Sequence, residues 1–196
     1  MKWGKRLRDE VEHNLPEWRG EFLSYKGLKK QLKLIHPRAK ECKRCEKRMR
    51  FSLRYCLNGR PNDANTRGDI GFIRLLEGEL EKVNSFFIEK EETYIIILKE
   101  FQNRVANLDN AGERLQVQRD ILNFHGEMVL LLHYCVLNIT GLMKIVKKHN
   151  KRTGTSIRSS FMPRVLQQPF FATDLLYRLM RECEAMLNRL FLLVDP

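Results

Sequence analysis

Two long segments of the chain carry apolar residues at alternating steps of three and four, the spacing that places side chains on one face of an α-helix. The first face comprises Ile73, Leu76, Leu80, Val83, Phe87, Tyr94, Ile97 and Phe101, interrupted only by Lys90. The second comprises Leu115, Leu122, His125, Val129, Leu132, Val136, Ile139 and Met143. The pattern predicts two helices of more than roughly thirty residues, each about 45 Å long. The short connection at residues 107–112 makes them antiparallel, with the two apolar faces packed on each other.

Shorter helices are predicted towards both ends of the chain. One covers residues 2–12, and after a turn at 13–16 another begins at Pro16, carries an apolar face from Trp18 to Ile35 and stops before Pro37. Two more are expected at residues 157–167 and 173–192, and no segment reads convincingly as a strand. We therefore expect an all-α fold with an N-terminal helical hairpin, two long antiparallel helices forming a bundle, and short C-terminal helices.

The length of 196 residues fits a single domain. We expect the N-terminal hairpin to occupy residues 1–36 and a basic loop, ending in the turn signal Asn58-Gly59-Arg60-Pro61, to occupy residues 37–67. The long helical pair then takes residues 68–152 and the C-terminal helices residues 153–196.

The chain is strongly basic, with 36 Lys and Arg against 24 Asp and Glu and a formal net charge of +12. The excess is concentrated in residues 25–60 and 144–164, and the second segment contains no acid. Such an excess predicts an anionic partner: a nucleic acid, an acidic membrane surface or a polyphosphorylated small molecule. Five unevenly spaced cysteines favour a reducing compartment. No signal peptide is visible, and the longest apolar stretch, residues 128–143, is short for a membrane span. Secreted and membrane-spanning classes are therefore disfavoured.

The second basic segment contains a row of lysines, Lys144, Lys147, Lys148 and Lys151. On a helix these four side chains fall within an arc of roughly 100°. A run of charge is usually a solvated face, but a merely soluble surface would alternate signs, and no acid lies three or four residues from these lysines. The row is therefore a candidate anion-binding surface.

Tyr25 and Lys29 form a second candidate, since residues four apart share one side of a helix. A tyrosine on an apolar face usually belongs to the core. Beside an ammonium group, however, its hydroxyl suits phosphate, because the lysine supplies charge and the phenol supplies a directional donor.

Several spaced motifs resemble the SPX domain, in particular the short stand-alone SPX proteins of plants. The matching segments are MKWGK (1–5), LPEW (15–18), LSYKGLKK (23–30), FIRLLE (72–77), VNSFF (83–87), HGEMVLL (125–131), KIVKKHNKRTG (144–154) and QPFF (168–171). They cover nearly the whole chain except about residues 37–67. Two departures are Trp3 in place of the usual Phe, and His149-Asn150 in place of a common Tyr-Asp pair.

The resemblance implies a non-enzymatic sensor of phosphate status that binds inositol polyphosphates, either inositol hexakisphosphate or inositol pyrophosphates. It implies that Tyr25, Lys29 and Lys147 form the central phosphate cluster, that Lys144, Lys148 and Lys151 extend it, and that Lys2 adds a contact. It further implies that the loaded protein binds and inhibits a coiled-coil MYB-type phosphate-starvation transcription factor in the nucleus and cytoplasm. We expect no cofactor, no direct DNA binding and no membrane association, and the long heptad-like faces allow a homodimer.

Two other functions stay open from the sequence. The chain fits the N-terminal regulatory module of a larger transporter, polyphosphate polymerase or ubiquitin ligase, and its basic segment at residues 25–60 fits a nucleic-acid-binding helical domain.

Weaker signals favour neither a metal site nor catalysis. Cys42 and Cys45, with His36 and Cys56 nearby, make only a weak zinc motif without a second cysteine pair. His125 lies on the predicted apolar face, which favours a packed core histidine. No nucleophile–base order, Gly-rich phosphate loop or carboxylate pair stands out, so catalysis is not expected.

Overall fold

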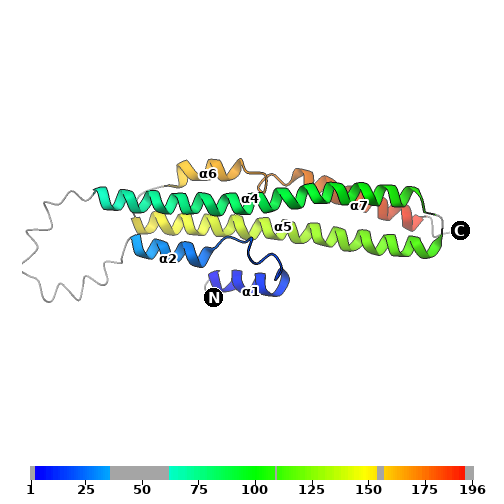
Figure 1. The fold of residues 1–196 in the computed structure, drawn as a ribbon, viewed down its shortest axis with the longest axis horizontal. Coiled ribbons are helices and arrows are strands. Elements are labelled where there is room, and N and C mark those ends of the chain that lie inside the picture. Colours follow the sequence, from blue (N-terminus) through cyan, green and yellow to red (C-terminus); the bar gives the residue numbers. More distant parts are fainter. Residues whose placement is uncertain (1–2, 36–61, 109, 154–156, 193–196) are drawn as a thin grey trace, which may run out of the picture.

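Two long antiparallel helices form the backbone of the molecule in a computed structural model, which describes residues 3–35, 62–108, 110–153 and 157–192 (Figure 1). Helix α4 (Asn62–Ala106) has 45 residues and α5 (Ala111–Thr153) has 43, so each is roughly 65 Å long. The side-chain oxygen Oδ1 of Asn110 accepts the backbone N–H of Glu113 at 2.7 Å. This bond satisfies one of the free amides at the start of α5 and fixes where the helix begins.

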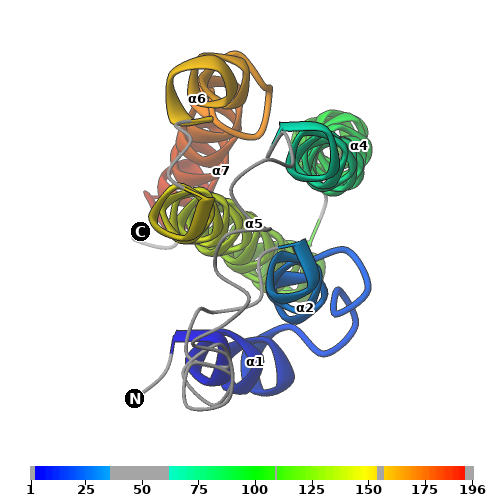
Figure 2. The same ribbon diagram turned by 90° about the vertical axis from the view of Figure 1, so that its left-hand side faces the viewer.

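In the described part of the chain, four shorter helices flank this pair, two on each side (Figures 1 and 2). They are α1 (Trp3–Asn14), α2 (Tyr25–Ile35), α6 (Arg158–Leu166) and α7 (Asp174–Leu192). Helix α5 lies in the middle and packs against α2, α4, α6 and α7. The prediction of an all-α bundle with an N-terminal hairpin and short C-terminal helices is confirmed.

The buried face of α5 differs from the predicted one. Leu122 and Val136, both assigned to the core, are 52% and 59% exposed, whereas Ile121, Met128 and Leu131 are fully buried. Apolar residues occupy more than one face of α5, because this central helix contacts partners on several sides. Spacing alone therefore does not identify the face that its neighbours cover. The predicted face remains as an exposed row of apolar residues, Leu115, Leu122, Val129, Val136 and Met143, seven positions apart.

The segment 15–24 is also different from the prediction. We expected a helix from Pro16, but α2 begins only at Tyr25, and the preceding residues form turns. Trp18 and Phe22 are buried as the apolar pattern indicates. The backbone of this segment, however, bonds to side chains of the long helices instead of continuing a helical ladder: the N–H of Leu23, for example, donates to Oδ1 of Asn138 at 2.8 Å.

Helix α4 begins earlier than expected. Residues 62–67, assigned to the end of a basic loop, form its first turns. Asn62 and Asp63 follow Pro61, and these residue types favour the beginning of a helix. The rest of the predicted loop, with the cysteine motif at residues 42–45, lies outside the described residues.

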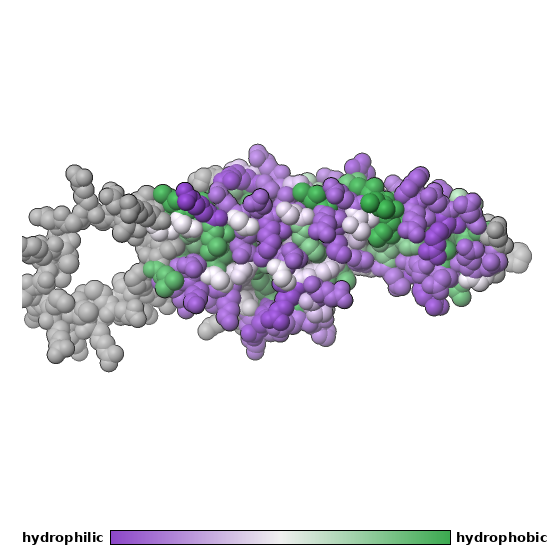
Figure 3. Space-filling view, viewed as in Figure 1, coloured by the Kyte–Doolittle hydropathy of each residue, from purple (hydrophilic) through white to green (hydrophobic). Residues whose placement is uncertain are grey.

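Helix α5 is long and apolar enough, over Gly112–Thr153, to cross a membrane by length and composition alone. Its most apolar window has a mean hydropathy of 1.8, and 44% of that window is buried within the bundle. Core helices pass the same test, so the feature is weak evidence for a span. The face of the molecule in Figure 3 is mostly hydrophilic, with apolar patches over the long helices.

Candidate functional site

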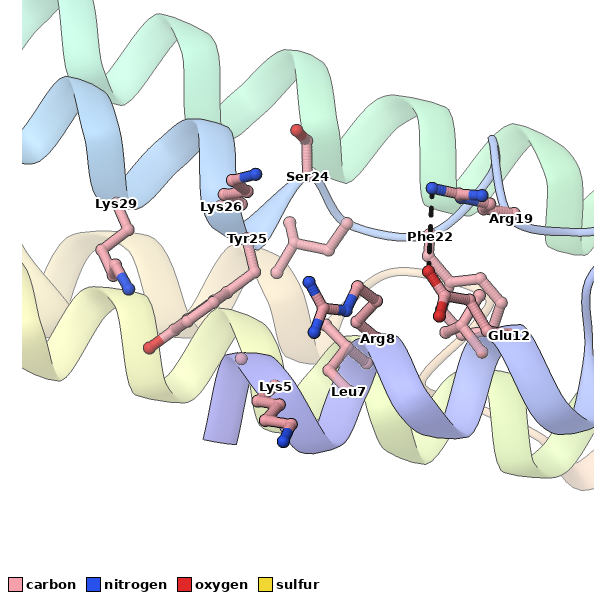
Figure 4. A pocket seen from close by; sticks show the side chains of 13 residues that line it. Lys5, Leu7, Arg8, Glu12, Arg19, Phe22, Ser24, Tyr25, Lys26 and Lys29 are labelled. Atoms are coloured by element: carbon pink, nitrogen blue, oxygen red, sulfur yellow. Dashed lines mark ion pairs between the residues drawn. The ribbon is translucent and has the colours of Figure 1, made fainter. Parts of the chain in front are cut away.

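A groove of about 670 Å³ lies between α1 and α2 (Figure 4). Its lining is rich in basic side chains, and the cations among them are Lys5, Arg8, Arg19, Lys26 and Lys29. One acid, Glu12, faces Arg19 at 3.8 Å. The groove therefore presents an excess of positive charge towards solvent.

Tyr25 forms the floor of the groove at one end. Its side chain is only 8% exposed and its ring meets Trp3 edge-on, with ring centroids 4.5 Å apart. Gly4 permits this packing, since a Cβ atom there would lie 3.1 Å from Cδ1 of Tyr25. Burial raises the pKa of the Tyr25 hydroxyl above its ordinary value. The phenol thus stays protonated at neutral pH and can donate a hydrogen bond to an anion.

Lys29 projects to the same end of the groove as the Tyr25 hydroxyl, one helical turn further along α2 (Figure 4). The four-residue spacing gives both side chains the same side of the helix, as predicted.

Contacts between α2 and α5 bring the lysine row close to this pair. Near the start of α2, Leu23 bonds to Asn138, and at its end a guanidinium N–H of Arg152 donates to the carbonyl of Lys33 at 3.2 Å. The two helices therefore run side by side in the same direction. Between these two contacts, Nζ of Lys144 lies 5.9 Å from the ring centroid of Trp3, the residue that packs on Tyr25.

Helix geometry separates the four lysines. Lys148 is seven residues after Gly141, which closely approaches Leu23, and four residues before Arg152, so it shares the side of α5 that faces α2. Lys144 and Lys151 are turned from it by roughly 40° and 60°, and Lys147 by roughly 100°. The contacts of Trp3 link Lys144 to Tyr25, and the helix register puts Lys148 nearest to the α2 side and Lys147 furthest round the helix. The roles of Lys147, Lys148 and Lys151 in binding stay predictions. Lys2 lies outside the described residues, so its role stays a prediction.

Within the described part of the chain, several lysines of this surface have no acid to neutralise their charge. Among the described residues, Lys29, Lys147 and Lys151 form no ion pair with an acid. Several cations on the rest of the bundle do: Lys82 pairs with Glu79, Lys90 with Glu127, Arg104 with Asp120 and Arg164 with Glu77. Clustered cations without acids raise the local positive potential and attract multivalent anions.

Four cations of the groove were not among the residues predicted from the sequence, namely Lys5, Arg8, Arg19 and Lys26. A signal was present for two of them. Lys5 and Arg8 are three residues apart on α1, next to the buried Leu7, and that spacing places them on one side of the helix.

His125 is not a core residue as predicted. Its side chain is 25% exposed, and Nε2 lies 3.3 Å from a carboxylate oxygen of Glu184, which links α5 to α7. The cause is the displaced core face, which buries Phe124 and Met128 instead. The described residues contain no group of three His, Cys, Asp or Glu side chains arranged to hold a metal ion.

Comparisons with known proteins match both the sequence and the fold. A family model described as "SPX domain" matches residues 107–165. SPX domain-containing protein 2 of Arabidopsis thaliana is 54% identical over 97% of this chain and 66% of its own length, and SPX domain-containing protein 1 of the same plant is 50% identical over 97% and 72%. SPX domain-containing protein 1 of Oryza sativa is 52% identical over 97% and 65%. The chain thus spans about two thirds of the length of these curated relatives.

A solved structure extends the match to the fold. The SPX domain of Chaetomium thermophilum glycerophosphodiester phosphodiesterase 1, in complex with inositol hexakisphosphate, is 26% identical, with a TM-score of 0.73 over 97% of this chain and 99% of that one. The SPX relatives match the chain almost throughout, which agrees with the prediction that it is not an enzyme. With half of its residues identical across nearly its whole length, the chain belongs to the SPX domain-containing proteins.

Proposed function

We propose that this chain binds inositol polyphosphates, including inositol hexakisphosphate and inositol pyrophosphates, on the surface formed by Tyr25, Lys29 and the lysine row of α5. The observation that carries the proposal is the approach of α2 and α5, which brings basic side chains of both helices towards one buried, protonated phenol. A ligand with many phosphates needs several point charges and a directional donor, and this surface supplies both. The inositol hexakisphosphate complex of the Chaetomium thermophilum SPX domain supports the same ligand class.

The energetics fit a shallow, charged site. A hydrogen bond to a charged group contributes about 1.5–3 kcal/mol, and micromolar affinity corresponds to about −8 kcal/mol. A handful of such contacts therefore gives micromolar binding without a deep pocket. Because the contacts are exposed ion pairs, the affinity falls with added salt.

Titration calorimetry with inositol hexakisphosphate tests the site with matched lysine variants. We expect Lys148→Ala and Lys29→Ala to weaken binding by about tenfold or more, since each removes a charge-assisted contact. Lys147→Ala tests the lysine that the resemblance placed at the centre, and the helix register predicts a smaller loss for it. Lys99→Ala, an exposed change of equal charge on the far part of α4, is the control.

The outcome that contradicts the site is equal affinity of the Lys148→Ala, Lys29→Ala and Lys99→Ala proteins. Circular dichroism of each variant excludes unfolding as the cause of a loss.

We further propose that the loaded protein binds and inhibits a coiled-coil MYB-type phosphate-starvation transcription factor in the nucleus and cytoplasm. Support comes from the plant SPX relatives and from the motifs that the chain shares with stand-alone SPX proteins. Size-exclusion chromatography of the chain with such a factor should give a complex in the presence of inositol hexakisphosphate, and none without it. A complex that forms equally in both conditions, or binding of the chain itself to duplex DNA, would contradict this assignment.

A further inference from the structure

Four consecutive residues immediately before α2 are each held by a side chain of a long helix. The carbonyl of Glu21 accepts the hydroxyl of Tyr134 at 2.9 Å, and the carbonyl of Phe22 accepts Nζ of Lys82 at 2.9 Å. The N–H of Leu23 donates to Oδ1 of Asn138 at 2.8 Å, and the N–H of Ser24 donates to Oε2 of Glu79 at 2.9 Å. We call Glu79, Lys82, Tyr134 and Asn138 the clamp.

The clamp residues also hold one another. Glu79 and Lys82 form an ion pair at 3.0 Å, one turn apart on α4. On α5, Nδ2 of Asn138 donates to the carbonyl of Tyr134 at 2.9 Å, which directs Oδ1 towards Leu23. Glu79, Lys82 and Asn138 are thus oriented by neighbours on their own helices. Together with Tyr134, the clamp supplies acceptors for two N–H groups and donors for two carbonyls of the segment 21–24.

The clamp lies directly before the start of α2. The carbonyl of Ser24 accepts the N–H of Leu28 at 2.9 Å, and this is the first bond of the helical ladder. A shift of that start by one residue would turn each side chain of α2 by about 100° about the helix axis. Tyr25 would then leave its contact with Trp3, and Lys29 would leave the end of the groove.

We propose that the clamp residues are positioning residues for anion binding: they set the rotation of α2 and thereby direct Tyr25 and Lys29 towards the lysine row of α5. This inference rests on the proposed ligand class. Substitution of Glu79 tests the proposal, because loss of its negative charge and loss of its positioning role predict opposite changes in the affinity for the anion. Removal of an acid near a polyanion strengthens binding by simple attraction, whereas loss of the Ser24 bond weakens it.

The experiment compares Glu79→Ala, Glu79→Gln and the exposed control Glu81→Ala in titrations with inositol hexakisphosphate. We expect Glu79→Ala to bind about tenfold more weakly than wild type. Glu79→Gln keeps an oxygen that accepts the Ser24 N–H, and we expect it to restore binding to within about threefold of wild type. Glu81→Ala should bind as tightly as wild type or slightly more tightly.

Hydrogen exchange provides a reading that does not depend on the ligand. In Glu79→Ala the amide of Ser24, which loses its acceptor, should lose protection, while those of α7 keep theirs. If Glu79→Ala binds as tightly as Glu81→Ala, or if protection at Ser24 is unchanged, the positioning role is wrong. If the wild-type chain fails to bind inositol hexakisphosphate, the proposed function is wrong, and the exchange data alone then decide whether the clamp sets the start of α2.

Discussion

Gly141 lies in the C-terminal half of α5, where Trp3 and Leu23 of the N-terminal segment approach it closely. A Cβ atom at this position would lie 2.6 Å from Cδ2 of Leu23 and 2.9 Å from Cη2 of Trp3. Both distances are shorter than carbon atoms tolerate. Leu23 is only 3% exposed, so its methyl group has little room to move away. We therefore choose Gly141→Ala as the substitution that tests the docking of the hairpin.

The expected magnitude combines two opposing effects. Alanine in a helix interior is favoured over glycine by about 1 kcal/mol. Overpacking of a filled site costs about 1–3 kcal/mol. The balance for Gly141→Ala lies between roughly neutral and about 2 kcal/mol of destabilisation. Gly126, on the same helix, has no atom within 4 Å of the added Cβ, so Gly126→Ala should stabilise the protein by about 0.5–1 kcal/mol.

Urea unfolding followed by circular dichroism measures both variants against wild type. We expect a clear difference between the two free energies of unfolding, with Gly141→Ala the less stable protein. Because the clash falls on Trp3 and Leu23, Gly141→Ala should also weaken the binding of inositol hexakisphosphate, and Gly126→Ala should leave it unchanged. Equal stabilisation by the two substitutions would refute the close approach of the hairpin to α5.

Three further predictions follow from buried and partly buried groups. Lys90 pairs with Glu127 at 3.1 Å, and Glu127 is 40% exposed, so a double-mutant cycle of Lys90→Met and Glu127→Gln should give a coupling of only about 0.5–1 kcal/mol; a larger coupling would contradict solvent screening of the pair. Burial raises the pKa of the Cys135 and Cys183 thiols to about 12, so both should resist alkylation. Mass spectrometry should find them unmodified by iodoacetamide at pH 8 in the native protein and modified in guanidinium. Rapid labelling of the native protein would disprove their burial. Burial raises the pKa of Tyr25 in the folded state, so the stability that its protonated hydroxyl contributes is present below about pH 10, the ordinary tyrosine value, and is lost as the pH rises further. Above that pH, the free energy of unfolding of Tyr25→Phe should therefore fall less than that of wild type. If the two proteins lose stability with pH in parallel, the burial of Tyr25 is contradicted.

The helices themselves were predictable because their signals are local. The apolar spacing of Leu76, Val83 and Phe87 locates the core face of α4, and all three residues are fully buried. The pairing of Tyr25 with Lys29 follows equally from the four-residue repeat of a helix. These features depend on neighbours in the sequence, so the sequence alone reveals them.

Features that depend on distant contacts were not predictable in the same way. The segment 15–24 has a helical apolar pattern, yet Asn138, 115 residues away from Leu23, binds its backbone instead. The core face of α5 is chosen by the helices around it, which is why His125 and Val136 were misplaced. Likewise, which lysine of the row lies nearest to α2 depends on how α2 and α5 are aligned. This alignment is a tertiary property, and the spacing of residues within one helix does not reveal it.

Helix α2 is fastened to its neighbours at both ends, since Asn138 holds the backbone at Leu23 and Arg152 donates to the carbonyl of Lys33. A short helix of 11 residues would fray in isolation. In the folded protein the two contacts hold α2 in place, so the conformational entropy of this helix is lost during folding and not on binding. An anion that docks against it loses little free energy to chain immobilisation, so differences in affinity among anions reflect the number and placement of their charges.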